Sequence, residues 1–179
     1  MSEQRVASRY AKALFDKAVE DNALEAVKND MLHLMELSQE SRDFVLFLES
    51  PLYKMAVKKN AIEKLTASYH PLSKGLFNLM IDKFREAYIP AVGNLFIQMY
   101  NRKFQIMDVF VTSAVELSKE TLSNIEKYVV EQTQAKSVVL NTQINSRVIG
   151  GLTIEFDGKI YDSTVVNQLN KIKKELQIA

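Results

Sequence analysis

The sequence predicts an α+β protein, with an N-terminal six-helix bundle over residues 1–105 and a small C-terminal α/β domain with a β-hairpin over residues 106–179. Before residue 105, apolar residues recur at helical spacing and lack the alternation that is typical of strands. Residues 106–115 are instead rich in Val, Phe and Thr, as strands are. Asp157-Gly158 separates two short apolar runs and predicts a tight hairpin, because both turn positions need a positive φ.

The N-terminal helices are predicted from apolar periodicity and from the turn residues between the periodic segments. We expect helices near residues 3–20, 23–38, 41–49, 54–69, 72–86 and 90–104. Pro51, Pro71 and Pro90 mark breaks, because a residue that precedes proline disfavours helical backbone angles.

The C-terminal domain is expected to contain strands, one helix within the sheet connections and one helix at the end. We place strands at 106–115, 136–144 and 147–156, and a helix from Ser118 to about Gln134.

Two further signals concern the end of the chain. Gly150-Gly151 runs into strand residues and indicates a bulge or a close backbone approach. Thr164 is a suitable N-cap for a final helix, which carries Val165, Leu169 and Ile172 at helical spacing.

Composition and charge exclude several function classes. The 23 Lys and Arg residues nearly balance the 22 Asp and Glu residues, which argues against a nucleic-acid partner. The chain has no Cys and only two His residues, without metal-ligand spacing, so we expect no metal site and no cofactor. The apolar stretch 87–101 is shorter than the roughly 20 residues that cross a bilayer, so no membrane span is expected.

We also find no pattern that supports catalysis. Gly150-Gly151 does not open a helix with Lys and Ser or Thr, as a phosphate-binding loop would, and no pair of carboxylates suits acid–base chemistry. Lys58-Lys59 and the lysines at 171, 173 and 174 are interpreted as solvated helix faces.

Two of the expected helices carry more apolar residues than one packing contact requires. Apolar residues cover about 240° of the helix at 3–20 and about 200° of the helix at 72–86. Either both helices lie at the centre of the bundle, or they leave an apolar groove that is open to a partner helix. Periodicity does not decide between these interpretations.

Three segments resemble one known family over essentially the whole chain. Residues 7–15 read ASRYAKALF, residues 47–51 read FLESP, and residues 150–165 read GGLTIEFDGKIYDSTV. These segments are similar to the delta subunit of F-type ATP synthases, whose mitochondrial counterpart is the oligomycin-sensitivity-conferring protein. Where the family has Gly-Arg before the sixth helix, this chain has Phe84-Arg85.

The resemblance implies a non-catalytic subunit of the peripheral stalk, or stator, which resists the torque of the rotor. In this family the N-terminal domain binds the N-terminal segments of the alpha subunits on the catalytic head. The C-terminal domain holds the b subunits of the membrane-anchored stalk. The resemblance also implies a peripheral location on the cytoplasmic face of the bacterial inner membrane.

Candidate binding residues follow from this interpretation. We expect the alpha-subunit helix to contact an apolar set on the first and fifth helices, namely Tyr10, Leu14, Phe15, Leu76, Leu79 and Met80. For the stalk we expect contacts at Gly150, Gly151, Val165, Leu169 and Ile172, although these residues are equally suited to the core of the small domain. The alternative function is a helical protein–protein adaptor unrelated to the synthase.

Overall fold

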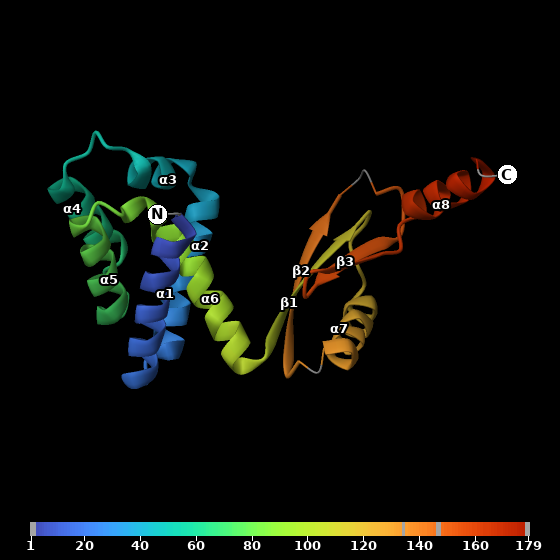
Figure 1. Ribbon diagram of the computed structural model, residues 1–179, viewed down its shortest axis with the longest axis horizontal. Helices are drawn as coiled ribbons and strands as arrows, with labels where there is room; N and C mark the ends of the chain where they lie inside the picture. Colours follow the sequence, from blue (N-terminus) through green and yellow to red (C-terminus); the bar gives the residue numbers. More distant parts are fainter. Residues whose placement is uncertain (1–2, 134, 146–147, 178–179) are drawn as a thin grey trace. The chain divides into compact units, whose positions relative to one another are not determined.

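The chain is α+β and divides into two compact units, Met1–Tyr100 and Asn101–Ala179. A computed structural model describes residues 3–133, 135–145 and 148–177 (Figure 1). The division lies within the last helix of the helical part, whereas we expected a boundary after residue 105.

Helices joined by short turns make up the described residues of the first unit, which include no strand. Its elements are α1 (Glu3–Glu20), α2 (Leu24–Glu40), α3 (Arg42–Glu49), α4 (Met55–Leu65), α5 (Pro71–Asp82), a short 3-10 helix η1 (Glu86–Tyr88) and α6 (Ile89–Phe104). All of them begin within one residue of the predicted starts, apart from η1, which was not predicted.

Helices α4 and α5 both end earlier than the predicted ends at 69 and 86. After α5, Phe84 adopts a left-handed conformation with φ 55°, and the Arg85 N–H donates to the Met80 carbonyl at 2.8 Å. This backward hydrogen bond closes the helix in the way that a glycine usually permits. The apolar periodicity continues past this point, so the pattern by itself overestimates the helix.

The core of the first unit draws on every helix. Helix α1 packs against α2 and α5, and its small residues Ala7, Ala11 and Ala18 allow a close approach. The largest fully buried side chains include Phe77 and Phe96.

One expectation about this unit is wrong. Lys58 is not on a solvated face: it is buried, and its Nζ donates to Glu86 Oε1 at 2.6 Å and to the Leu48 carbonyl at 2.7 Å. The ion pair joins α4 to η1, and the hydrogen bond to Leu48 joins α4 to the end of α3. Its neighbour Lys59 is partly exposed and pairs with Asp82 at 2.6 Å.

The second unit is built on a sheet with the strand order β2-β1-β3-β4. Its elements are β1 (Ile106–Ser113), α7 (Lys119–Thr133), β2 (Ser137–Ile144), β3 (Leu152–Phe156), β4 (Lys159–Asp162) and α8 (Val165–Gln177). Strand β2 is parallel to β1, as a helical crossover requires, while β1–β3 and β3–β4 are antiparallel.

Local turn chemistry explains the β3–β4 hairpin. Asp157 and Gly158 both have positive φ, at 50° and 69°, which confirms the predicted turn. The predicted strand 147–156 is too long over its described residues, because β3 begins at Leu152 and Gly151 has a φ of 80°. Residue 147 itself lies outside the described residues.

Helix α7 covers one face of the sheet and creates the core of this unit, which consists of Val109, Val111, Ile125, Val129, Ile154 and Phe156. The opposite face leaves Phe110, Val139 and Ile160 exposed. Helix α8 continues away from the end of β4 (Figure 1).

Candidate partner-binding sites

The first candidate site lies where α1 meets the C-terminal end of α5. The half-buried Tyr10 accepts a hydrogen bond at its Oη from Arg85 Nη1 at 3.0 Å. The guanidinium carbon of Arg85 lies 5.8 Å from the centre of the Tyr10 ring, within the range of a cation–π contact. The turn after α5 thereby orients the tyrosine.

The six residues expected to bind the alpha subunit divide into accessible and buried ones. Leu79 is 47% exposed on α5, and Tyr10 is half-buried on α1. Leu14, Leu76 and Met80 are buried in the core, as the central-helix interpretation predicts.

Phe15, the sixth residue of this set, packs its edge against Phe96 of α6, with the ring centres 5.6 Å apart. Among the six residues, Leu79 is exposed on α5, and Tyr10 and Phe15 are half-buried on α1.

The sequence analysis missed two residues at this position. Arg85 orients Tyr10, and Phe84 is 77% exposed in a left-handed conformation that is rare for a bulky side chain. The signal available in the sequence was the departure from the family's Gly-Arg. The importance of this departure was not recognised, because the helix that begins near residue 72 was predicted to continue to residue 86.

The second candidate site is the junction between β4 and α8, where Gly150-Gly151 meets the start of the helix. A side chain on Gly151 would place its Cβ 2.3 Å from the Ser163 carbonyl oxygen, so only glycine fits. The Gly150 carbonyl accepts from the Val165 N–H at 3.0 Å, and the Leu152 carbonyl accepts from the Ser163 N–H at 3.0 Å. The close backbone approach expected from the glycine pair is confirmed.

Side-chain hydrogen bonds complete this junction. Thr164 Oγ1 accepts from the Asn167 N–H at 3.2 Å, which confirms the predicted N-cap. Asp162 Oδ1 accepts from the Thr164 N–H at 2.9 Å. Hydrogen bonds from Thr164, with a smaller contribution from the charge of Lys171, hold the pKa of Asp162 below its usual value. The start of α8 is thus fixed to the sheet by several short-range contacts.

The apolar stripe of α8 is exposed. Val165, Leu169 and Ile172 are 39%, 55% and 52% exposed, and none of them belongs to the buried core of the unit. Their spacing of four and three residues places them on one face of the helix. An apolar stripe of this kind suits contact with another helix.

The two candidate sites are apolar surfaces. Within the described residues, no group of three or more His, Cys, Asp or Glu side chains is arranged to hold a metal ion. No helix in the same part of the chain is long and apolar enough to cross a bilayer. Exposed apolar residues such as those of α5 and α8 are typical of proteins that bind other proteins.

Comparisons with known proteins identify the family. The family model for the ATP synthase delta (OSCP) subunit matches residues 6–176. ATP synthase subunit delta of Carboxydothermus hydrogenoformans is 34% identical over 176 residues, covering 98% of this chain and 99% of the relative. The subunit of the same name from Lysinibacillus sphaericus is 30% identical over the same coverage. The chain belongs to the ATP synthase delta (OSCP) subunit family.

A solved structure has the same fold. A chain in the Toxoplasma gondii mitochondrial ATP synthase hexamer superimposes with a TM-score of 0.77 at 20% identity, covering 96% of this chain and 97% of that one. The family membership makes this protein a non-catalytic, peripheral-stalk subunit of an F-type ATP synthase. An adaptor unrelated to the synthase is not favoured.

Proposed function

We propose that the two units bind different partners, with the first unit holding the N-terminal segments of the alpha subunits and the second holding the b subunits of the stalk. The helices α1 to α6 then act together as a six-helix bundle on the catalytic head. The observation that carries this proposal is the apolar stripe of α8, which lies outside the core of its own unit.

For the alpha subunit, the accessible contact comprises Tyr10 and Leu79. Leu14, Leu76 and Met80 support these residues from the core, and Phe15 contributes on the side of α6. An amphipathic helix that covers Leu79 removes apolar surface from water, while the Tyr10 ring offers both an apolar face and a polar hydroxyl.

For the stalk, the contact comprises Val165, Leu169 and Ile172 on α8. Gly150 and Gly151 contribute by fixing the start of the helix rather than by offering side-chain surface. A rigid junction is useful in a stator, because a force on α8 then reaches the sheet without first bending a loose linker.

The location follows from the same proposal. The chain works at the cytoplasmic face of the bacterial inner membrane, attached to the synthase through its partners. The relatives from Carboxydothermus and Lysinibacillus are bacterial proteins, which supports a bacterial setting.

Separate titrations of the full-length chain test the two contacts. In calorimetry we expect it to bind a peptide of the alpha-subunit N-terminus and, independently, the cytoplasmic segment of the b subunit. Leu79→Asp should weaken the first interaction alone, and Leu169→Asp the second alone. Loss of both interactions in both variants, with circular dichroism unchanged, would contradict a division of labour between the units.

A further inference from the structure

Both histidines of the chain lie where α2 meets the start of α5. His33 is on α2, and its Nδ1 shares a hydrogen bond with Oη of the buried Tyr69, in the turn before α5. His70 is the N-cap of α5, and its backbone N–H donates to Asp30 Oδ2 of α2 at 2.9 Å. This junction therefore holds every imidazole that the chain contains.

The imidazole of His70 caps the first turn of α5. Pro71 at the first helical position has no N–H, so the first backbone donor of the helix belongs to Leu72. This N–H donates to His70 Nδ1 at 3.3 Å, and the Lys74 N–H donates to the His70 carbonyl at 3.2 Å. N-caps are usually Ser, Thr, Asp or Asn, whose side-chain oxygens do not change protonation near neutral pH. Helix α5 is instead capped by a group that titrates in this range.

Protonation affects the two histidines differently. A neutral imidazole has one acceptor nitrogen, and the imidazolium ion has none. The Leu72 N–H is a donor only, so its hydrogen bond to His70 is lost when His70 takes up a proton. The partner of His33 is a hydroxyl, which accepts as well as donates, so that hydrogen bond is compatible with both charge states. Of the two histidines, His70 is the one whose contact depends on its charge.

Tyr69 keeps its hydroxyl proton while the imidazoles titrate. Burial, together with the charges of Asp30 and Glu36, raises the pKa of Tyr69 to about 12. Its ring also packs against Phe77 of α5, with the ring centres 6.2 Å apart. The contacts of Tyr69 with α2 and α5 therefore persist when His70 changes its charge, and the change is confined to the first turn of α5.

The charges around His70 favour release of the cap when the imidazole is protonated. The N-terminal end of a helix carries a partial positive charge, which disfavours an imidazolium ion at that position. The carboxylate of Asp30, which also accepts from the Ser73 hydroxyl at 2.6 Å, offers the imidazolium ion a partner other than the helix end. The ammonium group of Lys74 donates to the Ala67 carbonyl at 2.6 Å and adds no negative charge to the start of α5.

We propose that His70 is a pH-sensitive N-cap, which closes the first turn of α5 when its imidazole is neutral and releases the Leu72 N–H when the imidazole is protonated. The first turn of α5 is then ordered at neutral pH and frays under mildly acidic conditions. The switch depends on neither of the proposed partners, because every contact that it uses lies within the first unit.

Hydrogen exchange of the Leu72 amide tests the switch. It is measured by NMR on the full-length chain at about pH 8 and about pH 5, on either side of the range in which imidazoles titrate. After correction for the intrinsic exchange rate, the protection of this amide should fall about fivefold at the lower pH, the effect of losing a typical N-cap. The Phe44 amide is the internal control, because it donates at 3.2 Å to the hydroxyl of Ser41, an N-cap that does not titrate. Its protection should stay unchanged.

Two variants assign the effect to one imidazole. His70→Asn keeps a side-chain acceptor at the N-cap but cannot titrate, so the protection of the Leu72 amide should be equal at both pH values. His33→Gln removes the other imidazole, and the fivefold loss of protection should remain. Circular dichroism establishes that both variants are folded at both pH values.

Three results would overturn the switch. The first is equal protection of the Leu72 amide at both pH values in the unmodified chain. The second is a loss of protection that persists in His70→Asn, because it would then arise from another group, and the third is a loss that disappears in His33→Gln. Imidazole ¹⁵N shifts give an independent measurement: His70 Nδ1 should be the unprotonated nitrogen at about pH 8, and a proton on Nδ1 would contradict its role as the acceptor.

Discussion

Helices α1 and α8 both carry apolar residues that we assigned to partner binding, but these residues differ in how deeply they are buried. On α1, Leu14 is buried in the core and Phe15 packs on a neighbouring helix. On α8, Leu169 and Ile172 are more than half exposed. A wide apolar arc therefore indicates a helix that is surrounded by its own unit, whereas a narrow stripe at the end of a small domain indicates a surface for another chain.

The largest effect that we expect concerns the buried ion pair of the first unit. Lys58→Met leaves the Glu86 carboxylate buried without its partner and should lower the free energy of unfolding by about 3–5 kcal/mol in urea titrations. Lys59→Met is the matched control, because its pair with Asp82 is partly exposed and contributes about 0–1 kcal/mol. Equal losses in the two variants would contradict the difference in burial.

A buried methionine and an exposed leucine are expected to differ in their contribution to the free energy of unfolding. Met80→Ala should lower the free energy of unfolding by about 2–5 kcal/mol, because it leaves a cavity in the core. Leu169→Ala should change it by less than about 0.5 kcal/mol and should instead weaken binding of the b segment. Denaturant titrations of both variants measure the contrast, and a stability loss of similar size in Leu169→Ala would place α8 within the core.

A smaller effect is expected for the aromatic residue at the meeting of α1 and α5. Tyr10→Ala should weaken binding of the alpha-subunit peptide by about 1–3 kcal/mol in calorimetry, through loss of the ring. Tyr10→Phe keeps the ring but removes the acceptor of the Arg85 hydrogen bond, and should retain most of the affinity. Unchanged affinity in Tyr10→Ala would remove this residue from the site.

One substitution in the turn after α5 is expected to stabilise the protein. Phe84→Gly should raise the free energy of unfolding by about 1 kcal/mol, because glycine adopts the left-handed conformation without steric cost and little packing is lost from an exposed ring. Thermal unfolding measures the change, and Lys83→Gly is the control that should destabilise. A decrease in stability for Phe84→Gly would show that the ring is needed for packing.

The smallest expected effect is the pH dependence at the start of α8. Because the pKa of Asp162 is lowered in the folded chain, its contribution to stability is present above the pKa of the unfolded chain and is lost as the pH falls through the folded value. NMR titration of the Asp162 carboxyl should give a pKa below the usual value of an Asp side chain. In Thr164→Ala, which removes the Thr164 side-chain hydrogen bond, the pKa should move back towards that value.

Local chemistry made much of the fold predictable. The hairpin at Asp157-Gly158 and the cap at Thr164 depend on residues close in sequence, so the sequence shows them directly. The start of β3 was mispredicted because Gly151 is needed for contact with Ser163, twelve residues away in sequence. The helical pattern likewise gave no sign of the turn at Phe84.

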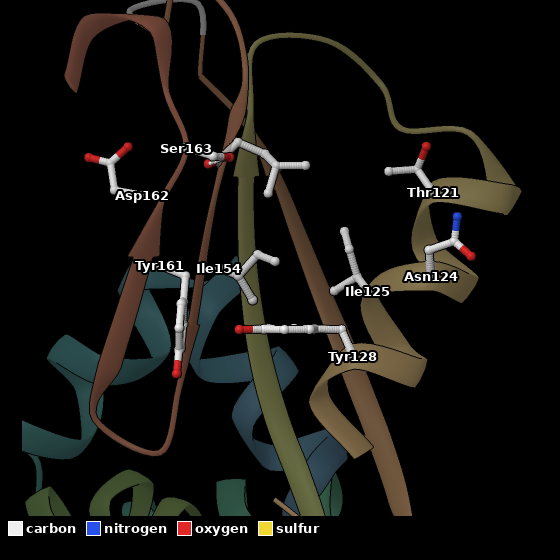
Figure 2. Close-up of a pocket in the computed structure, with 9 residues that line it drawn as sticks. Thr121, Asn124, Ile125, Tyr128, Ile154, Tyr161, Asp162 and Ser163 are labelled. Carbon is white, nitrogen blue, oxygen red and sulfur yellow. Dashed lines mark hydrogen bonds between the residues drawn. The ribbon is translucent and has the colours of Figure 1, made fainter. Parts of the chain in front are cut away.

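The binding surfaces depended more on the tertiary structure. The sequence indicated which helices are rich in apolar residues, but only packing decided that Met80 is buried while Leu79 is exposed. Tyr128 of α7 and Tyr161 of β4 line one pocket of the second unit (Figure 2), although they are far apart in the sequence, so no local pattern predicts it.

The sequence by itself determined the order of helices and strands, the α+β class and the family, because these follow from periodicity, turn chemistry and motifs that act over short distances. The tertiary structure decided which lysine is buried, which apolar side chains reach the surface and where one helix leaves part of a sheet uncovered. Burial depends on what every other segment covers, and that is a property of the packed chain rather than of any one segment.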